Sequence, residues 1–253
     1  MSGATEIYYN ELMRFFGLIM QDEGDSIDKA AALLVQEIKD DRIINVIGTG
    51  GHSNIGAWEM FYRAGGLRCI NAILDPGTSL EPGALRSTII ERALGYGTAV
   101  LTAYEVNEGV LIIVNAYGLN TMTIEVALEA RKRGIKTIGV TSRTFSESVP
   151  KDHPARHPSK QNLCDVVDVH IDTHMPVMDA TVPIDGLLTP VGPTSTILNA
   201  FCLNMLVVRT VELCMDQGIE PPVNISANVA FTPEMTEYSR RMMEKYKHRL
   251  YHY

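Results

Sequence analysis

The chain has 253 residues, of which 45% are hydrophobic, and this is enough apolar material for a full core and argues against disorder. The net charge of −8 and the absence of a dense basic stretch argue against nucleic-acid binding, because an acidic surface repels phosphate backbones. No apolar run approaches the roughly 20 residues that span a bilayer, and the first residues do not resemble a secretory signal, so we expect no membrane association. The four cysteines show no CxxC pair or metal-ligand spacing, which predicts reduced thiols, no metal site and a cytoplasmic location.

The first part of the chain predicts helices followed by a buried strand. Residues from about 1 to 41 form an expected N-terminal helical extension, in which Asp25 or Ser26 caps a helix with an apolar stripe. The segment Ile43–Ile47 has the composition of a strand. It ends in a glycine-rich loop, after which a helix is expected to run to about Ala64.

Strands and helices alternate along the rest of the chain. Further strands are predicted at Cys69–Leu74, Val110–Val114, Lys136–Thr141 and Val166–Ile171. Helices are predicted at about 85–104 and 124–133, a loop at 144–162, a long apolar helix capped by Ser195 and running to about Gln217, and a C-terminal helix at about 233–253. This alternation predicts an α/β fold with a doubly wound, mostly parallel five-stranded sheet, helices on both faces and extra terminal helices, as a single domain over residues 1–253.

Polar and glycine residues follow three of the predicted strands, at the point where each strand ends. Because the carboxyl ends of parallel strands meet at one edge of a sheet, these loops are expected to form one pocket. Glycines let backbone amides approach an anion closely, and the N-terminus of the next helix adds positive charge. Amides, hydroxyls and one guanidinium suit a sugar that carries an anionic group. The residues predicted to bind substrate are Gly48, Thr49, Gly50, Gly51 and Ser53 after the first strand, Asn115, Tyr117, Gly118 and Asn120 after the third, and Ser142 and Arg143 after the fourth.

Two other interpretations of the first loop stay open. A glycine turn after a strand can be a purely structural connection. The second is a dinucleotide site, since Gly48-x-Gly50 opens a helix and Asp75 ends the next strand, where a ribose-binding carboxylate would lie. However, the third position of that fingerprint is Ser53 rather than glycine, which obstructs close packing of the helix on the strand.

Longer segments of the chain resemble a known family. They are GTGGHSNIGAWEMFYRAGG, ILDPG, IEVALEARKRGIKTIGVTS, VGPTSTILNAF and PPVNISANV. Together they resemble stand-alone proteins of the sugar isomerase (SIS) domain family, described as phosphosugar isomerases or sugar-binding proteins, over about Asp25 to Tyr246. The resemblance implies the SIS fold and a sugar pocket to which Ser195 and Thr196 contribute hydroxyls and amides. From the residues alone, Ser195 is equally explained as a plain helix N-cap.

The chain departs from the family pattern in two loops. The first loop has one more glycine, Gly51, than the family's Gly-Thr-Gly-His-Ser. In the second loop, Asn115, Ala116, Tyr117 and Leu119 stand where SIS domains commonly place phosphate-binding serines. Fewer hydroxyls and an added phenol favour a differently shaped acidic group, such as a sulfonated sugar, or an uncharged sugar over an ordinary phosphosugar.

Aldose–ketose isomerisation needs a base that removes the proton next to the carbonyl and an acid that protonates the carbonyl oxygen. We expect Glu59 to be the base and His52 to be the acid or ring-opening group, since histidine titrates near neutrality. The resemblance implies that Glu59 is donated across a dimer interface, which predicts a homodimer or homotetramer with shared active sites. The simpler alternatives are a surface ion pair of Glu59 with Arg63 and a capping or packing role for His52.

The sequence therefore predicts an isomerase that interconverts aldose and ketose forms of a small anionic sugar, without a metal or another cofactor. Two alternatives remain. One is a non-catalytic module that binds or senses a sugar phosphate, although the residues before Ile27 are too few and too little basic for a DNA-reading motif. The other is lyase or etherase chemistry on an amino-sugar phosphate, which would use the same carboxylate, because a fold does not fix a reaction.

Overall fold

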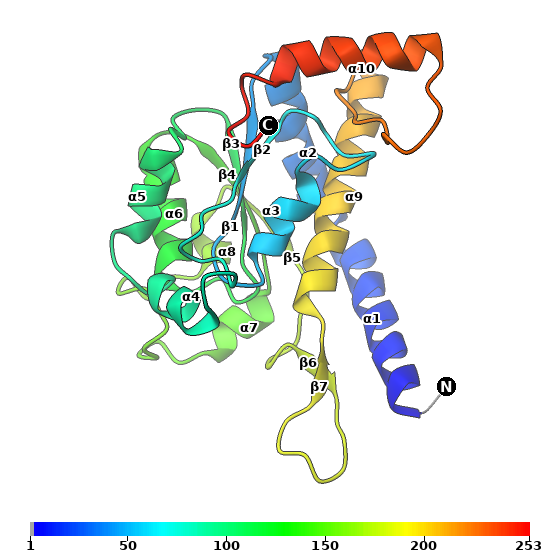
Figure 1. Ribbon diagram of the computed structural model, residues 1–253. Coiled ribbons are helices and arrows are strands. Elements are labelled where there is room, and N and C mark those ends of the chain that lie inside the picture. The colour runs from blue at the N-terminus through cyan, green and yellow to red at the C-terminus, as the bar shows by residue number, and fades with distance from the viewer. Residues whose placement is uncertain (1–2) are drawn as a thin grey trace.

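A computed structural model describes residues 3–253 and contains the predicted parallel sheet (Figure 1). The strands are β1 (Ile44–Gly48), β2 (Ile70–Ile73), β3 (Val110–Val114), β4 (Lys136–Thr141) and β5 (Val169–Asp172). They form a five-stranded sheet in the order β2-β1-β3-β4-β5, and every neighbouring pair is parallel. The predicted α/β fold class is confirmed. The strand order reverses between β1 and β3, where the chain first winds toward β2 and then away from it.

Helices cover both faces of the sheet, and the side chains of each strand alternate between two hydrophobic cores. In β3, Ile112 and its alternate neighbours face α2, α3 and α9, while Leu111 and Ile113 face α5, α6 and α8. Figure 1 shows these two groups of helices on opposite sides of the strands. The helices are α1 (Gly3–Asp22), α2 (Gly24–Lys39), α3 (Asn54–Met60), α4 (Ala84–Ile90), α5 (Tyr96–Ala103), α6 (Thr121–Lys132), α7 (Arg143–Ser148), α8 (Leu163–Val166), α9 (Ser195–Asp216) and α10 (Pro233–Tyr246).

Several predicted boundaries were wrong for local reasons. The single helix expected at 85–104 is two helices, α4 and α5, because Gly95 adopts a left-handed backbone with φ of 83° between them. The helix after the first loop ends at Met60 rather than near Ala64, and Tyr62 that follows has φ of 51°. The strand expected at Val166 begins only at Val169, because the preceding residues form α8.

Two further parts of the chain differ from the expectation. The loop predicted at 144–162 contains most of α7, and a hairpin of β6 (Ala180–Val182) and β7 (Val191–Pro193) was not predicted at all. The hairpin projects from the molecule beside α1 (Figure 1). Neither Asp25 nor Ser26 caps α2, since the helix begins at Gly24 directly after α1 and has Glu23 at its N-cap position.

Helix α9 corrects the expectation that no apolar run approaches the length of a membrane span. It has 22 residues and is, by length and composition alone, apolar enough to cross a bilayer. Its apolar character is accounted for by packing, since Leu198, Leu203 and Leu206 are fully buried in the core that α9 shares with α2.

Helix α4 buries little of its surface. Ser87 is its one buried residue, and Leu85 and Ile89 are exposed. The helix is flanked by Gly83 with φ of 136° and by Gly95, both with positive φ. It is therefore a weakly packed element between two points of unusual backbone freedom.

Two glycine-to-alanine substitutions, one at the tight turn after β1 and one inside α1, are expected to have opposite effects on the free energy of unfolding. A Cβ on Gly48 would lie 2.1 Å from the Ser53 carbonyl oxygen, so Gly48→Ala must displace the loop and is expected to destabilise the fold by about 1–3 kcal/mol. Gly17, inside α1, has no neighbour within 4 Å of such a Cβ, so Gly17→Ala is expected to stabilise by about 0.5–1 kcal/mol. Urea unfolding of both variants measures this, and equal effects would contradict it.

Candidate functional site

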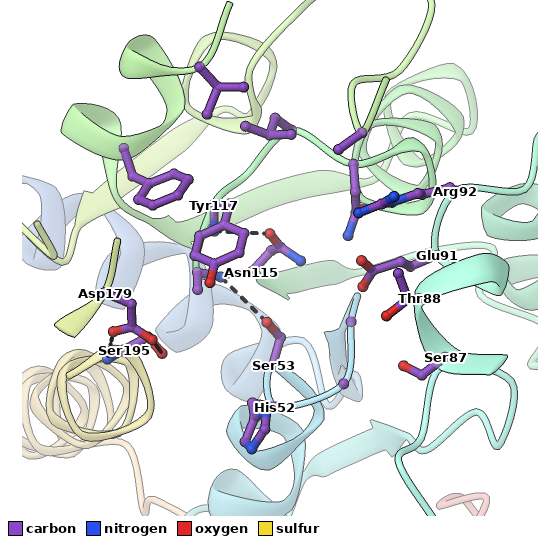
Figure 2. Close-up of a pocket in the computed structure, with 18 of the residues that line it drawn as sticks. His52, Ser53, Ser87, Thr88, Glu91, Arg92, Asn115, Tyr117, Asp179 and Ser195 are labelled. Carbon is purple, nitrogen blue, oxygen red and sulfur yellow. Dashed lines mark hydrogen bonds between the residues drawn. The ribbon is translucent and has the colours of Figure 1, made fainter. Parts of the chain in front are cut away.

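A cavity of about 500 Å³ opens at the carboxyl ends of β1 and β3, where the strand order reverses. Open parallel sheets bind ligands at this position, because the two loops diverge there and leave a crevice. Its walls come from the loops after β1 and β3, from α4, from the segment after α7, and from the region where the hairpin meets α9 (Figure 2).

Most of the predicted substrate-binding residues line this cavity. They come from three segments distant in the sequence, which the sheet and α9 bring together. The predicted residues at the cavity are Gly50, Gly51, His52 and Ser53 after β1, Asn115, Tyr117 and Asn120 after β3, and Ser195 and Thr196 at the start of α9.

Other predicted residues lie outside the cavity, and their polar groups have partners elsewhere. The Thr49 hydroxyl is buried 2.6 Å from the hydroxyl of Thr123. Ser142 donates its hydroxyl to the Met175 carbonyl and accepts the Phe145 amide, so it caps α7. Arg143 pairs with carboxylates on the surface. Gly48 and Gly118 are glycines because neighbouring atoms pack closely against them. A Cβ on Gly118, for example, would lie 2.5 Å from Thr141 Oγ1. The binding roles of these five residues stay predictions.

Glu59, the predicted base, also lies outside the cavity of its own chain. Its carboxylate accepts a hydrogen bond of 2.9 Å from Asn204 Nδ2 on α9 and lies 3.4 Å from Arg63 Nε. The surface pair with Arg63 is therefore present in the structure. A catalytic role for Glu59 stays a prediction, and it requires a cavity other than the one beside β1 of the same chain.

Two asparagines join the loops that form the cavity floor. The side-chain amides of Asn115 and Asn120 both donate to the Thr49 carbonyl oxygen, at 3.0 Å each. Asn115 Oδ1 in turn accepts the backbone amides of Tyr117 and Gly118, at 3.1 and 2.8 Å. The side-chain amides of Asn115 and Asn120 thus hold the second loop in shape and join it to the first.

Tyr117 forms one wall of the cavity (Figure 2). Its ring stacks on Phe145 with centroids 4.2 Å apart and planes 16° apart, so the residue that replaces a short hydroxyl is held in place by α7. Burial raises the pKa of the Tyr117 phenol, and the carboxylates of Asp179 and Glu91 add to this increase. The phenol is consequently a neutral hydrogen-bonding group facing the cavity.

Several residues that line the cavity could not be predicted from the sequence. Glu91 and Arg92 come from the end of α4, and Asp179 comes from the segment before β6. Burial raises the pKa of the Glu91 carboxyl, and the positive charge of Arg92 opposes this effect. Neither α4 nor the hairpin carries a motif, so only the folded arrangement reveals these groups. Ser87, Thr88 and His153 also line the cavity.

A metal site does not emerge from the described part of the chain. Among residues 3–253, no three His, Cys, Asp or Glu side chains gather in a group that could hold a metal ion.

The family model of the SIS domain matches residues 7–142. The chain belongs to the SIS domain family. A UPF0309 protein of Geobacillus thermodenitrificans is 34% identical to this SIS protein over 244 residues, covering 96% of this chain and 95% of the relative. A UPF0309 protein of Caldanaerobacter subterraneus is also 34% identical, covering 98% of this chain and 99% of the relative.

Two solved structures share the fold of this SIS protein at low sequence identity. A phosphoheptose isomerase from Francisella tularensis superimposes with a TM-score of 0.51 at 14% identity, covering 84% of this chain and 100% of that chain. A phosphoheptose isomerase from Neisseria gonorrhoeae gives 0.52 at 17% identity, with 84% and 97% covered. The expected SIS fold is thereby confirmed.

The start of α9 in this SIS protein is capped by a carboxylate from the hairpin rather than by Ser195. Asp179 accepts the backbone amides of Thr194 and Ser195 at 2.8 and 2.6 Å, and the Ser195 hydroxyl at 2.7 Å. Thr194 occupies the N-cap position and Ser195 is the first helical residue, so the predicted Ser195 cap was wrong. Asp179 satisfies the free amides and complements the positive end of the helix.

We expect Asp179→Ala to destabilise the SIS protein by about 1 kcal/mol, because it leaves two helix-terminal amides and a hydroxyl without their acceptor. Asp185→Ala, at an exposed position on the same hairpin, is the matched control and is expected to have no measurable effect. Urea unfolding measures both free energies. Equal stability of the two variants would contradict the capping role.

Proposed function

We propose that this SIS protein is an aldose–ketose isomerase that acts on a small anionic sugar by proton abstraction next to the carbonyl. The observation that carries the proposal is a cavity at the reversal of the strand order, lined by charged, hydroxyl and amide groups from five segments. Two proteins of the same fold are named phosphoheptose isomerases. Their low identity supports the fold alone, so the chemistry is argued from the cavity.

Arg92 supports an anionic substrate. It lines the cavity, and within residues 3–253 its guanidinium makes no hydrogen bond or ion pair. Thr88, one helical turn before Arg92, lines the cavity with it, as does Ser53 across the crevice. A guanidinium with nearby hydroxyls suits a phosphate or sulfonate, and it supplies the anion contacts that the serine-free second loop lacks.

The surroundings of Glu59 support a homodimer with shared active sites. Glu59 lies on α3 beside α9, and the same two helices expose apolar side chains at Ile55, Trp58, Ile197 and Val208. Trp58, the single tryptophan of the chain, is 61% exposed, which is a large exposed fraction for so large an apolar side chain. We propose that a second copy covers this face and receives Glu59 in its own cavity.

We further propose a cytoplasmic location. All four cysteines are free and buried, and burial raises the pKa of the Cys69 thiol to about 12. Thiols kept in this form suit a reducing compartment.

The first test is a thermal-shift screen against hexose phosphates, sulfonated hexoses, hexuronic acids and free hexoses. Ligands that stabilise the protein are then followed by NMR in deuterated water for exchange of the C2 proton. We expect anionic hexoses to bind and to exchange, and Arg92→Gln to weaken their binding about tenfold while leaving free hexoses unaffected. Binding of anionic hexoses without exchange would contradict an isomerase and favour a sensor.

Mixing two variants tests the shared active site. Glu59→Gln is expected to lose C2 exchange about 10²–10⁴-fold, because glutamine cannot accept the proton. If Glu59 acts in the partner's cavity, co-refolding Glu59→Gln with Arg92→Gln creates mixed dimers that each contain one intact site. At substrate concentrations well below the dissociation constant, Arg92→Gln alone runs at about a tenth of the wild-type rate, and random pairing then raises exchange in the mixture to about a quarter of the wild-type rate. Absence of any recovery in mixtures whose dimers are shown to be mixed would contradict the shared site.

A further inference from the structure

Glu91 lies over the first loop, at the end of α4. It follows the last residue of α4, and its backbone carbonyl accepts the Met122 amide at 3.0 Å, which ties the end of α4 to the first turn of α6. Its side chain extends over the first loop, since a Cβ on Gly50 would lie 2.7 Å from Glu91 Oε2 and 3.3 Å from Asn115 Nδ2. Glycine at this position leaves the carboxylate room beside the cavity floor.

The cavity contains two carboxylates, and one of them has no partner. Asp179 is fully engaged with the start of α9, where its carboxylate accepts two backbone amides and the hydroxyls of Thr194 and Ser195. Glu91 makes no side-chain hydrogen bond or ion pair with any residue from 3 to 253, although it is partly buried. A partly buried carboxylate that faces a ligand-sized cavity and has no protein donor of its own is free to bond to a ligand, which is the arrangement of a functional group rather than of a structural one.

We propose that Glu91 is a catalytic proton-transfer residue of this cavity, which donates a proton to the carbonyl oxygen of the bound sugar and later takes one from the neighbouring hydroxyl. This inference rests on the isomerase activity proposed above and deepens it, because it assigns the transfer between oxygens to the chain that forms the cavity. Glu59 of the partner chain would serve the transfer between carbons.

The step balances without a further reactant. A base removes the proton from C2, and the electron pair of that C–H bond forms the C1–C2 double bond. The π pair of the carbonyl moves onto O1, which takes the proton from the Glu91 carboxyl. The Glu91 carboxylate then removes the O2 proton, the C2 carbonyl forms, and C1 recovers the proton held by the base. Both catalytic groups end in their starting protonation states.

The environment of Glu91 suits a group that starts protonated. Burial raises its pKa, and the charge of Arg92 beside it offsets this effect in part. Across the cavity lie the Tyr117 phenol and the Asp179 carboxylate, and His52 and His153 line the same space (Figure 2). His52 is exposed at the rim, where the predicted ring-opening role remains compatible with an acid deeper in the cavity.

Glu91→Gln tests the inference, with Glu81→Gln as the matched control. Glu81 precedes the same helix, is exposed and does not line the cavity. The probes are hexose phosphates and sulfonated hexoses, and the readouts are their dissociation constants, C2 exchange and aldose–ketose conversion. We expect Glu91→Gln to keep its binding and to lose exchange and conversion about 10²–10⁴-fold, while Glu81→Gln equals wild type. Glu91→Asp, which keeps the acid but shortens its reach, is expected to retain part of the conversion.

The pH profile separates catalysis from a structural effect. Because the acid must be protonated, the wild-type rate is expected to fall as pH rises through the raised pKa of Glu91. In Glu91→Gln, the rate should no longer fall over this pH range. In Glu59→Gln, the small remaining rate should still fall with pH as in the wild type.

Each outcome has a defined meaning. Unchanged conversion by folded Glu91→Gln overturns the role of Glu91 and leaves the proposed isomerase intact. Loss of binding together with conversion overturns it as well and makes Glu91 a substrate-binding residue. If wild type converts none of the probes and exchanges none of their C2 protons, both this inference and the proposed function fail. If Glu91→Gln does not fold, the test uses Glu91→Asp and the pH profile of the wild type. The role of Glu91 is then overturned if Glu91→Asp converts the probes at the wild-type rate and the wild-type rate does not fall at high pH.

Discussion

The cavity depends on the two hydrogen bonds that Asn115 and Asn120 donate to the Thr49 carbonyl. Loops after neighbouring parallel strands diverge by default, because each chain must turn into a helix on a different face of the sheet. The two amides tie the divergent loops together at their base, and Asn115 also shapes the backbone of the second loop. The positions of Ser53, Tyr117 and the space above Gly50 all follow from this connection. The asparagine amides therefore give the cavity a floor that is hydrogen-bonded at both loops.

The sheet could be predicted from the sequence because β3 is a continuous apolar run and the other strands are short segments rich in β-branched residues that end in glycine or polar turns. Val110–Val114 and Lys136–Thr141 were predicted with the bounds that the structure gives. Helix ends were less predictable, since Gly95 splits one expected helix and Asp179 caps another from a distant segment. The hairpin escaped prediction because its strands have three residues each and are held by contacts with α1 and α9 rather than by a strong pattern.

From the strand pattern, the candidate site was predictable only where its residues belong to loops directly after strands, while Ser195 and Thr196 were predicted from the resemblance. His52, Ser53 and Tyr117 fall into this group, because parallel strands bring such loops to one edge whatever lies between them. Glu91 and Asp179 do not, since their positions depend on how α4 and the hairpin pack across the crevice. Glu59 was predicted from its place in a motif, yet it lies outside the cavity of its own chain. There its carboxylate accepts a hydrogen bond from Asn204.

The weak packing of α4 has a thermodynamic consequence for whatever binds in the cavity. Ser87, Thr88, Glu91 and Arg92 all reach the cavity from this segment, which lies between Gly83 and Gly95 and exposes its apolar residues. A segment with so little buried surface opens at a small fraction of the free energy of global unfolding. A ligand that contacts it must also restrict it, so part of the interaction energy is spent on lost conformational entropy. Any ligand held by this wall therefore binds less tightly than it would to a rigid wall with the same contacts, and it dissociates faster.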